Sequence, residues 1–222
     1  MRRGEKMRRA VIGAAIAGAL VAASSAWAGT TTVIAVSDDK FTPDSVVIPV
    51  DLGPVSWRWD DAVVDEHNVR QDSKLFYSGE PTSTITTQYT ISASAGTYHY
   101  YCEEHGSRSG GMDGKLRIRP VFFPAPPKRG ESIMFGVRWA TSTGTGDQWD
   151  VKYKGRGTGG KYVTWLKNTD KLSAVFGESG EPVAPQTGDV FRFKARTERS
   201  SNPDKRSAFS PVATTPPLAP PG

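Results

Sequence analysis

Four residues in the first half of the chain have side chains that bind soft and borderline metal ions. Cys102, His105 and Met112 lie close together on what should be one loop joining two strands, and His67 comes from a different strand upstream. Two imidazole nitrogens, one thiolate and one thioether form the ligand set of a trigonal copper site, in which methionine is the long axial ligand. The pattern therefore predicts a metal site in this half of the chain.

Each of these residues also has an ordinary structural interpretation. The single cysteine could be a small buried hydrophobic residue or a thiol for intermolecular pairing. His105 by itself could be a surface histidine, and Met112 could plug the end of a sandwich. Met112 is the only methionine between positions 29 and 120 and follows a glycine-rich polar segment, so it has little core to fill. Taken together, the neighbours favour metal binding.

The segments that must position these residues are short and rich in β-branched and aromatic side chains. Gly, Pro, Asp or Ser clusters bound each of them, and no window keeps a helical period, which predicts an all-β sandwich. In the first half the expected strands are Thr31–Val36, Val46–Val50, Val55–Trp59, Thr84–Ile91, Thr97–Tyr101 and Lys115–Arg119. Strand alternation should turn Tyr98, Tyr100 and Cys102 toward the core, and His99 and Tyr101 outward.

Residues 30–119 resemble a plastocyanin-like cupredoxin, a type 1 blue copper domain. The matching pieces are Phe41-Thr-Pro43, Val55-Ser-Trp57, His67-Asn68-Val69, Ser78-Gly79, Gly96-Thr-Tyr98-His-Tyr100-Tyr101-Cys102 and Met112-Asp-Gly114. The resemblance implies a Greek-key sandwich that binds one copper ion, with His67 and His105 as nitrogen ligands, Cys102 as thiolate and Met112 as axial ligand.

One segment departs from the pattern of this family. Six residues, Gly106–Gly111, separate His105 from Met112, where plastocyanin-like loops usually have four. Glycines permit turns with positive φ, so the segment is expected to form a bulging loop. Met112 would then be a distant axial ligand, or a backbone carbonyl would take its place.

The second half is predicted to be a second β-sandwich. Its expected strands are Ser132–Trp139, Gln148–Lys154, Lys161–Leu166, Leu172–Phe176, Val190–Arg196 and Phe209–Ala213. It is similar to a fibronectin type III domain, an immunoglobulin-like sandwich, in Val137-Arg-Trp139, Trp149-Asp-Val151-Lys-Tyr153, Trp165, Gly188-Asp-Val-Phe191-Arg-Phe193-Lys-Ala195-Arg and Ser207-Ala-Phe209-Ser-Pro211.

Charge and proline divide the chain into segments. Five basic residues, an apolar run and Ala26-Trp27-Ala28 predict a signal peptide over 1–28, and hence a secreted or extracytoplasmic protein of the periplasm or cell surface with no membrane span after cleavage. The next segments are a copper domain (29–120) of net charge −5, a proline-rich linker (121–129), a second domain (130–215) and a tail (216–222) expected to be disordered. Residues 121–222 carry a net charge of +6.

The ligand set predicts an exported one-electron carrier rather than an enzyme. Larger copper enzymes need further histidines, and the chain has three, of which two are already used. The expected partner is a redox protein such as a basic cytochrome, and the second domain would be a spacer or docking module. Its alternating basic residues predict contact with an anionic cell-wall polymer, or with the acidic first domain, rather than with nucleic acid. Copper sequestration or delivery, or a structural, adhesive role, are the alternatives.

Overall fold

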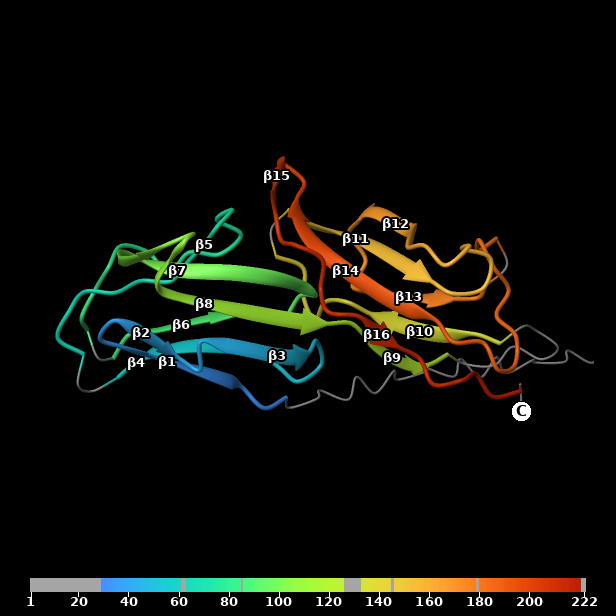
Figure 1. Ribbon diagram of the computed structural model, residues 1–222, viewed down its shortest axis with the longest axis horizontal. Helices are drawn as coiled ribbons and strands as arrows, with labels where there is room; N and C mark the ends of the chain where they lie inside the picture. The colour runs from blue at the N-terminus through green and yellow to red at the C-terminus, as the bar shows by residue number, and fades with distance from the viewer. Residues whose placement is uncertain are drawn as a thin grey trace, which may run out of the picture.

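A computed structural model describes residues 29–60, 63–84, 86–125, 133–144, 146–178 and 180–220. Every regular element in these ranges is a β-strand, and the strands form two sandwiches that lie end to end (Figure 1). The predicted all-β sandwich fold is confirmed. The predicted signal peptide, 1–28, lies outside the described residues, and among those described no helix is long and apolar enough to cross a membrane.

The first sandwich packs two four-stranded sheets face to face. One has the order β2-β1-β4-β6 and the other β3-β8-β7-β5. The bounds are β1 Thr32–Ser37, β2 Lys40–Thr42, β3 Ser45–Pro49, β4 Val55–Trp59, β5 Arg70–Gln71, β6 Gln88–Ile91, β7 Gly96–Ser107 and β8 Gly110–Arg119. Because the chain changes sheet after β2, β3, β4, β5 and β6, two neighbouring pairs, β1–β4 and β3–β8, run parallel.

Alternating side chains of both sheets fill the space between them, as expected for strands with one buried face. Ile34 and Val36 of β1 and Trp57 of β4 are completely buried, opposite Tyr100 of β7 and Leu116 of β8. The same core contains Cys102 and Met112. The alternation therefore carries both residues into the sandwich interior.

The second sandwich has a core of its own. Its sheets are β13-β10-β9 and β12-β11-β14-β15, with β16 also pairing with β14. The bounds are β9 Val121–Pro124, β10 Phe135–Arg138, β11 Asp147–Lys154, β12 Val163–Thr169, β13 Ser173–Phe176, β14 Arg192–Arg199, β15 Asn202–Arg206 and β16 Ala213–Thr214. Trp139, Trp149, Phe176, Phe191 and Phe193 lie fully buried between the sheets.

The prediction that 121–129 is a linker is wrong for its first residues, and 126–129 lie outside the described residues. Val121–Pro124 forms β9 and pairs with β10, Pro124 lying opposite Phe135. A proline fits here because β9 is an edge strand, where a missing N–H breaks no ladder. Only Pro120 separates β8 from β9, so one strand leads almost directly from the first sandwich into the second.

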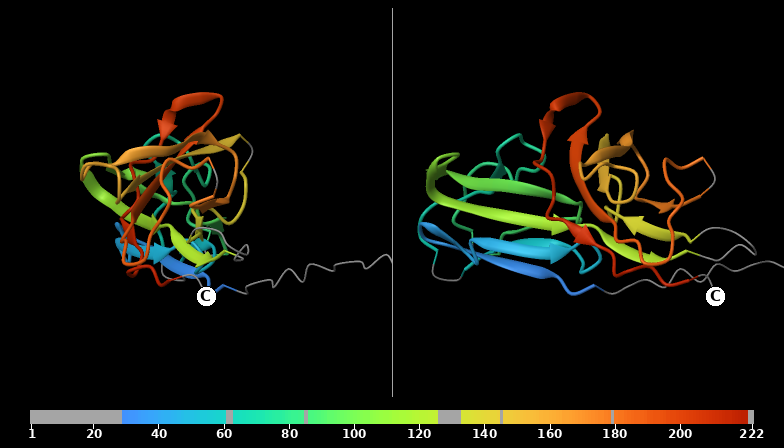
Figure 2. Two further views of the ribbon diagram at one scale, coloured as in Figure 1. Left: turned by 90° about the vertical axis from the view of Figure 1, so that its right-hand side faces the viewer. Right: turned by 45° about the vertical axis from the view of Figure 1, so that its right-hand side comes forward.

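Main-chain hydrogen bonds join the two sandwiches. The amide of Ala95 donates to the carbonyl of Trp139 at 2.6 Å, and Thr97 exchanges two main-chain hydrogen bonds with Ala208. The hydroxyl of Tyr98 lies 2.8 Å from that of Thr197. The views in Figure 2 show the two sandwiches in contact along this junction.

The expected disorder of the tail is also wrong for part of it. β16 ends at Thr214, just before the tail, and within the tail the amide of Leu218 donates to the carbonyl of Asp189 at 3.0 Å. The amide of Gly188 donates back to the carbonyl of Leu218 at 2.9 Å. These bonds hold the proline-rich segment against the second sandwich.

Candidate metal centre

His67 is held by the backbone of the segment between β4 and β5. Its amide and carbonyl both bond to Thr82, and the residue is completely buried. This isolated bridge ties together two segments that are otherwise irregular. Because the main chain is fixed on both sides of the bridge, the imidazole has a defined position at the end of the first sandwich.

Cys102 and His105 come from a break in the β7–β8 ladder. Tyr101 pairs with Asp113, and the next pair along the ladder is Gly106 with Gly111, so four residues of β7 stand against Met112 alone. Such an excess on one strand makes it bulge away from its partner. The bulge carries Cys102, which is fully buried, and His105, which is half-buried.

Two glycines close the hairpin beyond the bulge. A Cβ on Gly106 would lie 2.3 Å from the carbonyl oxygen of Met112, and one on Gly111, which has a φ of +91°, would lie 2.5 Å from the carbonyl oxygen of His105. β7 continues to Ser107 and β8 begins at Gly110, so the extra residues lengthen the hairpin. The prediction that 106–111 forms a bulging loop is therefore wrong.

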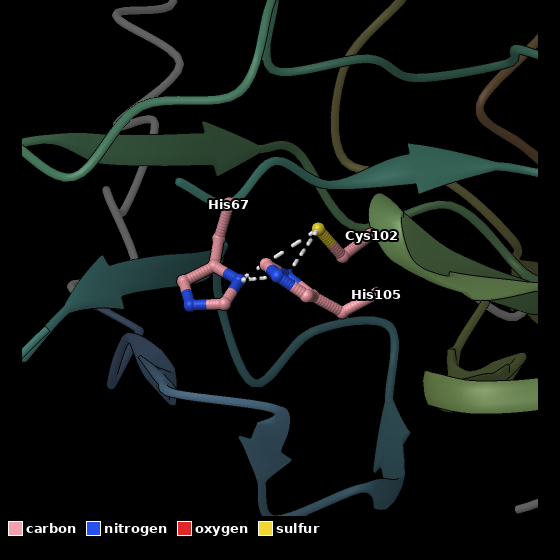
Figure 3. Close-up of side chains that lie close together, drawn as sticks. All are labelled: His67, Cys102 and His105. Carbon is pink, nitrogen blue, oxygen red and sulfur yellow. Dashed lines mark hydrogen bonds between the residues drawn. The ribbon is translucent and has the colours of Figure 1, made fainter. Parts of the chain in front are cut away.

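The three predicted nitrogen and sulfur ligands converge. Nδ1 of His67 lies 3.1 Å from Nδ1 of His105, and Sγ of Cys102 lies 3.7 Å and 3.8 Å from these two atoms (Figure 3). The centre of this triangle is about 2.1 Å from each corner, close to metal–nitrogen bonds of ~2.0–2.1 Å and metal–sulfur bonds of ~2.3 Å. The three side chains fit a single metal ion.

The chemistry of these donors fits copper. A trigonal arrangement of two imidazoles and one thiolate is the arrangement that blue-copper sites use. Met112, 1% exposed, is the single residue across the ladder from the bulge that carries Cys102 and His105. Its side chain belongs to the same core as Cys102, and its role as axial ligand remains a prediction.

An aspartate that the sequence interpretation missed stands behind His67. Oδ1 of Asp38 lies 3.4 Å from Nε2 of His67 and accepts hydrogen bonds from the amides of Val64 and Asp65. Burial alone would raise the pKa of Asp38, but the hydrogen bonds from Asp65, Val64 and His67 outweigh it and the pKa lies below its usual value. A carboxylate on the outer nitrogen of a metal-binding histidine orients the ring.

Asn68 connects the two segments that supply the ligands. Its side-chain amide donates to the carbonyl of Gly79 at 3.0 Å and to the carboxylate of Glu103 at 2.8 Å, and its oxygen accepts from the amide of Glu103 at 2.9 Å. The residue is completely buried. Asn68 therefore fixes the distance between the residues that follow His67 and Cys102.

Glu103 is half-buried and paired with a basic residue. It forms an ion pair with Arg70 at 2.9 Å, and Arg70 also donates to the hydroxyl of Tyr101 at 2.7 Å and stacks over its ring. Tyr101 was expected to face outward, and it does lie on the opposite side of β7 from Tyr100, but Arg70 covers it and leaves it 7% exposed.

Other acids lie beside His105. Asp39 and Asp65, both exposed, each have a carboxylate oxygen within 4.8 Å of a ring nitrogen of His105. Asp38 and Asp39 were missed because, in sequence, they look only like the turn between β1 and β2.

The third histidine lies away from this centre. Nδ1 of His99 is 2.8 Å from Asp72 and its Nε2 is 2.9 Å from Asp113. Burial would lower the pKa of His99, but the hydrogen bonds and charges of Asp72 and Asp113 outweigh it, so the pKa is raised. His99 therefore connects strands and takes no part in the cluster, in line with the prediction that it faces outward.

Comparisons with known proteins add little beyond the fold. No family model and no curated protein sequence matches the chain. Among solved structures, it is similar to the chicken interferon gamma receptor alpha chain, with 13% identity, a TM-score of 0.29, and coverage of 70% of this chain and 86% of that one. It is also similar to the FN1–FN3 domains of chicken CNTN1, with 9% identity, a TM-score of 0.25, and coverage of 84% and 65%.

Proposed function

We propose that this protein is an exported one-electron carrier with one type 1 copper ion held by His67, Cys102 and His105. The observation that carries the proposal is the triangle of Nδ1, Sγ and Nδ1 atoms, whose sides of 3.1, 3.7 and 3.8 Å suit a trigonal ion. Copper bound there would alternate between Cu(I) and Cu(II), taking up and releasing one electron.

Hydrogen bonds from surrounding residues hold the proposed ligands in place. Asn68 joins the two ligand segments through three hydrogen bonds, and Asp38 faces the outer nitrogen of His67. A ligand set that is already assembled needs little rearrangement when the charge of the ion changes, which favours fast electron exchange.

His105 is the ligand through which electrons would pass. His67 and Cys102 are completely buried, whereas His105 is half-buried. It lies eight residues along β7 from Thr97, which pairs with the second sandwich. Because a strand rises about 3.3 Å per residue, His105 is at the end of β7 far from the second sandwich. A redox partner, for which a basic cytochrome remains our proposal, would therefore dock at the end away from the second sandwich.

A visible spectrum of the mature protein with added Cu(II) tests the proposal. We expect one copper per chain and an intense blue or green band from the Cys102 thiolate. Cys102→Ser should abolish the band, whereas His99→Gln, which removes the one histidine outside the cluster, should keep it. The same band in the Cys102→Ser variant would contradict the assignment of Cys102 as a copper ligand.

Electron exchange separates a carrier from a copper store. We expect the reduced protein to exchange electrons with a basic cytochrome in stopped-flow mixing. Very tight retention of Cu(I), with negligible exchange with any partner, would favour sequestration or delivery by the same ligands.

A further inference from the structure

The outward side of β11 and β14 is lined with cations. The register places Lys154 opposite Arg192, Lys152 opposite Lys194 and Asp150 opposite Arg196. Side chains directly opposite each other on antiparallel strands point to the same face, so these residues form two parallel rows. We call the set of Lys152, Lys154, Arg192, Lys194 and Arg196 the cationic face. It belongs to the second sandwich (Figure 1) and is independent of the metal centre.

Lys152 and Lys194 lie opposite each other, and their positive charges repel. Like charges directly opposite each other across two strands destabilise a sheet. Within the described ranges, neither lysine has a carboxylate within ion-pair distance. Burial and then the charge of Lys152 lower the pKa of Lys194, as expected for an ammonium group that lacks an anion. An anion placed between the two would remove this repulsion.

A single aromatic ring organises the cationic face. Lys152, Lys194 and Arg196 all lie within 5.0 Å of the ring centre of Phe209, and Lys194 also lies 4.3 Å from that of Tyr162. A ring has only two sides, so three cations leave little of it for stacking. The ring of Phe209 is therefore largely taken up by cations and offers little surface for stacking.

The acids of the face are hidden. Asp150 and Glu198 are only 5% and 4% exposed, and both pair with Arg196, at 2.6 Å and 3.8 Å. Both carboxylates lie beneath Arg196, and within the described ranges no carboxylate is within ion-pair distance of Lys152, Lys154, Arg192 or Lys194. What a partner meets at this surface is positive charge.

A further cation, Arg117, comes from the first sandwich near its junction with the second. The carbonyl of Phe209 accepts a hydrogen bond from the hydroxyl of Thr97 at 2.9 Å, and Thr97 lies opposite Arg117 in the β7–β8 ladder. Because opposite residues share a face, the Arg117 side chain starts on the same side as Thr97. Along β14 alone, Arg192, Lys194 and Arg196 span about 13 Å at ~3.3 Å per residue, which is longer than one small anion could use.

We propose that the cationic face binds a linear anionic polymer that carries carboxylate or phosphate groups and no bases. The length of the row favours a polymer over a small ion. The occupied ring of Phe209 disfavours single-stranded nucleic acid, because such strands are held largely by bases stacked on free aromatic rings. The unpaired Lys152 and Lys194 give the polymer its strongest point of attachment.

Fluorescence anisotropy with labelled polymers at low salt tests this. Polygalacturonate supplies carboxylates, polyphosphate supplies phosphates, an oligothymidine supplies phosphates with bases, and dextran is neutral. We expect binding to polygalacturonate, to polyphosphate or to both, weakened by salt, weaker binding per charge to the oligonucleotide, and none to dextran. Tighter binding to the oligonucleotide than to either base-free polymer would overturn the proposal, as would binding to none of them.

Charge variants locate the site. Lys152→Gln with Lys194→Gln should weaken polymer binding on the order of tenfold, since each lysine near an anionic surface contributes. Lys171→Gln with Lys205→Gln removes the same charge elsewhere and should change binding less than about threefold if location matters more than net charge. Equal losses in both double variants would contradict the proposal.

A charge reversal guards against a folding artefact. Lys152→Glu places a carboxylate opposite Lys194, so it should leave the melting temperature unchanged or raise it while abolishing polymer binding. The polymer should in turn raise the melting temperature of the wild-type protein and not that of this variant. Unchanged polymer binding in a folded Lys152→Glu protein would place the polymer elsewhere.

Discussion

At the scale of single residues, we expect Met112 to set the reduction potential of the proposed centre. It is buried and stands alone opposite the bulge that carries Cys102 and His105. The axial ligand of a trigonal copper site tunes the potential more than it retains the metal. Met112→Leu should therefore keep the copper and its colour while shifting the potential measured by protein-film voltammetry. Complete loss of copper would show that Met112 is a principal ligand.

His99 makes the stability of the first sandwich depend on pH. Because its folded-state pKa is raised above the usual ~6.5, the charged imidazole stabilises the fold fully below that pH, and the contribution is lost as pH rises through the folded-state pKa. We expect the melting temperature of the wild type, relative to that of His99→Gln, to fall as the pH rises above about 6.5.

The comparison between the two proteins isolates His99 from the other histidines, which both proteins share. For a chain of this size, each kcal/mol corresponds to a shift of about 2–4 °C. A difference between wild type and variant that stays constant over this pH range would show that Asp72 and Asp113 do not hold a charged imidazole.

At the scale of elements, the β7–β8 hairpin depends on close approach of its strands beyond the bulge. A methyl group on Gly106 would come within 2.3 Å of the Met112 carbonyl oxygen, so Gly106→Ala must push the strands apart. We expect a loss of about 1–3 kcal/mol in the free energy of unfolding and weaker copper binding, measured by denaturation and by metal titration. Ser109→Ala, in the exposed turn of the same hairpin, should leave both unchanged. A normal affinity for copper in the Gly106→Ala protein would argue against this dependence.

At the scale of the whole molecule, charge is separated between the two ends. Asp39 and Asp65 lie beside His105, whereas the cationic face lies on the second sandwich. Rim charges mainly accelerate encounter, and salt screens them with a Debye length of about 10 Å at 0.1 M. Electron exchange with a basic cytochrome should therefore slow as salt rises, and slow several-fold in an Asp39→Asn, Asp65→Asn variant.

Glu103 is a poor choice for this test, because it is paired with Arg70 and holds Asn68. Asp51→Asn with Asp204→Asn is the matched control, since it removes two charges away from His105. Exchange rates that change neither with salt nor with the loss of Asp39 and Asp65 would contradict docking of the redox partner beside His105.

The sequence by itself was enough to predict the strands that rest on local signals. Alternation and turn residues located β1, β3, β4 and β11 to within about two residues, since both depend on neighbours in the chain. It missed β2, β5, β9 and β15, which are short or contain proline. These strands form because a partner strand is already in place, and a sequence window does not contain that partner.

The candidate ligands could likewise be named from residue type, because few side chains bind copper and this chain has few of them. Only the tertiary structure decided that His67 meets Cys102 and His105, that Glu103 turns inward to Arg70, and that Lys152 faces Lys194. Each of these depends on the register between strands far apart in the chain. A shift of one residue would have turned the same side chains to the other face.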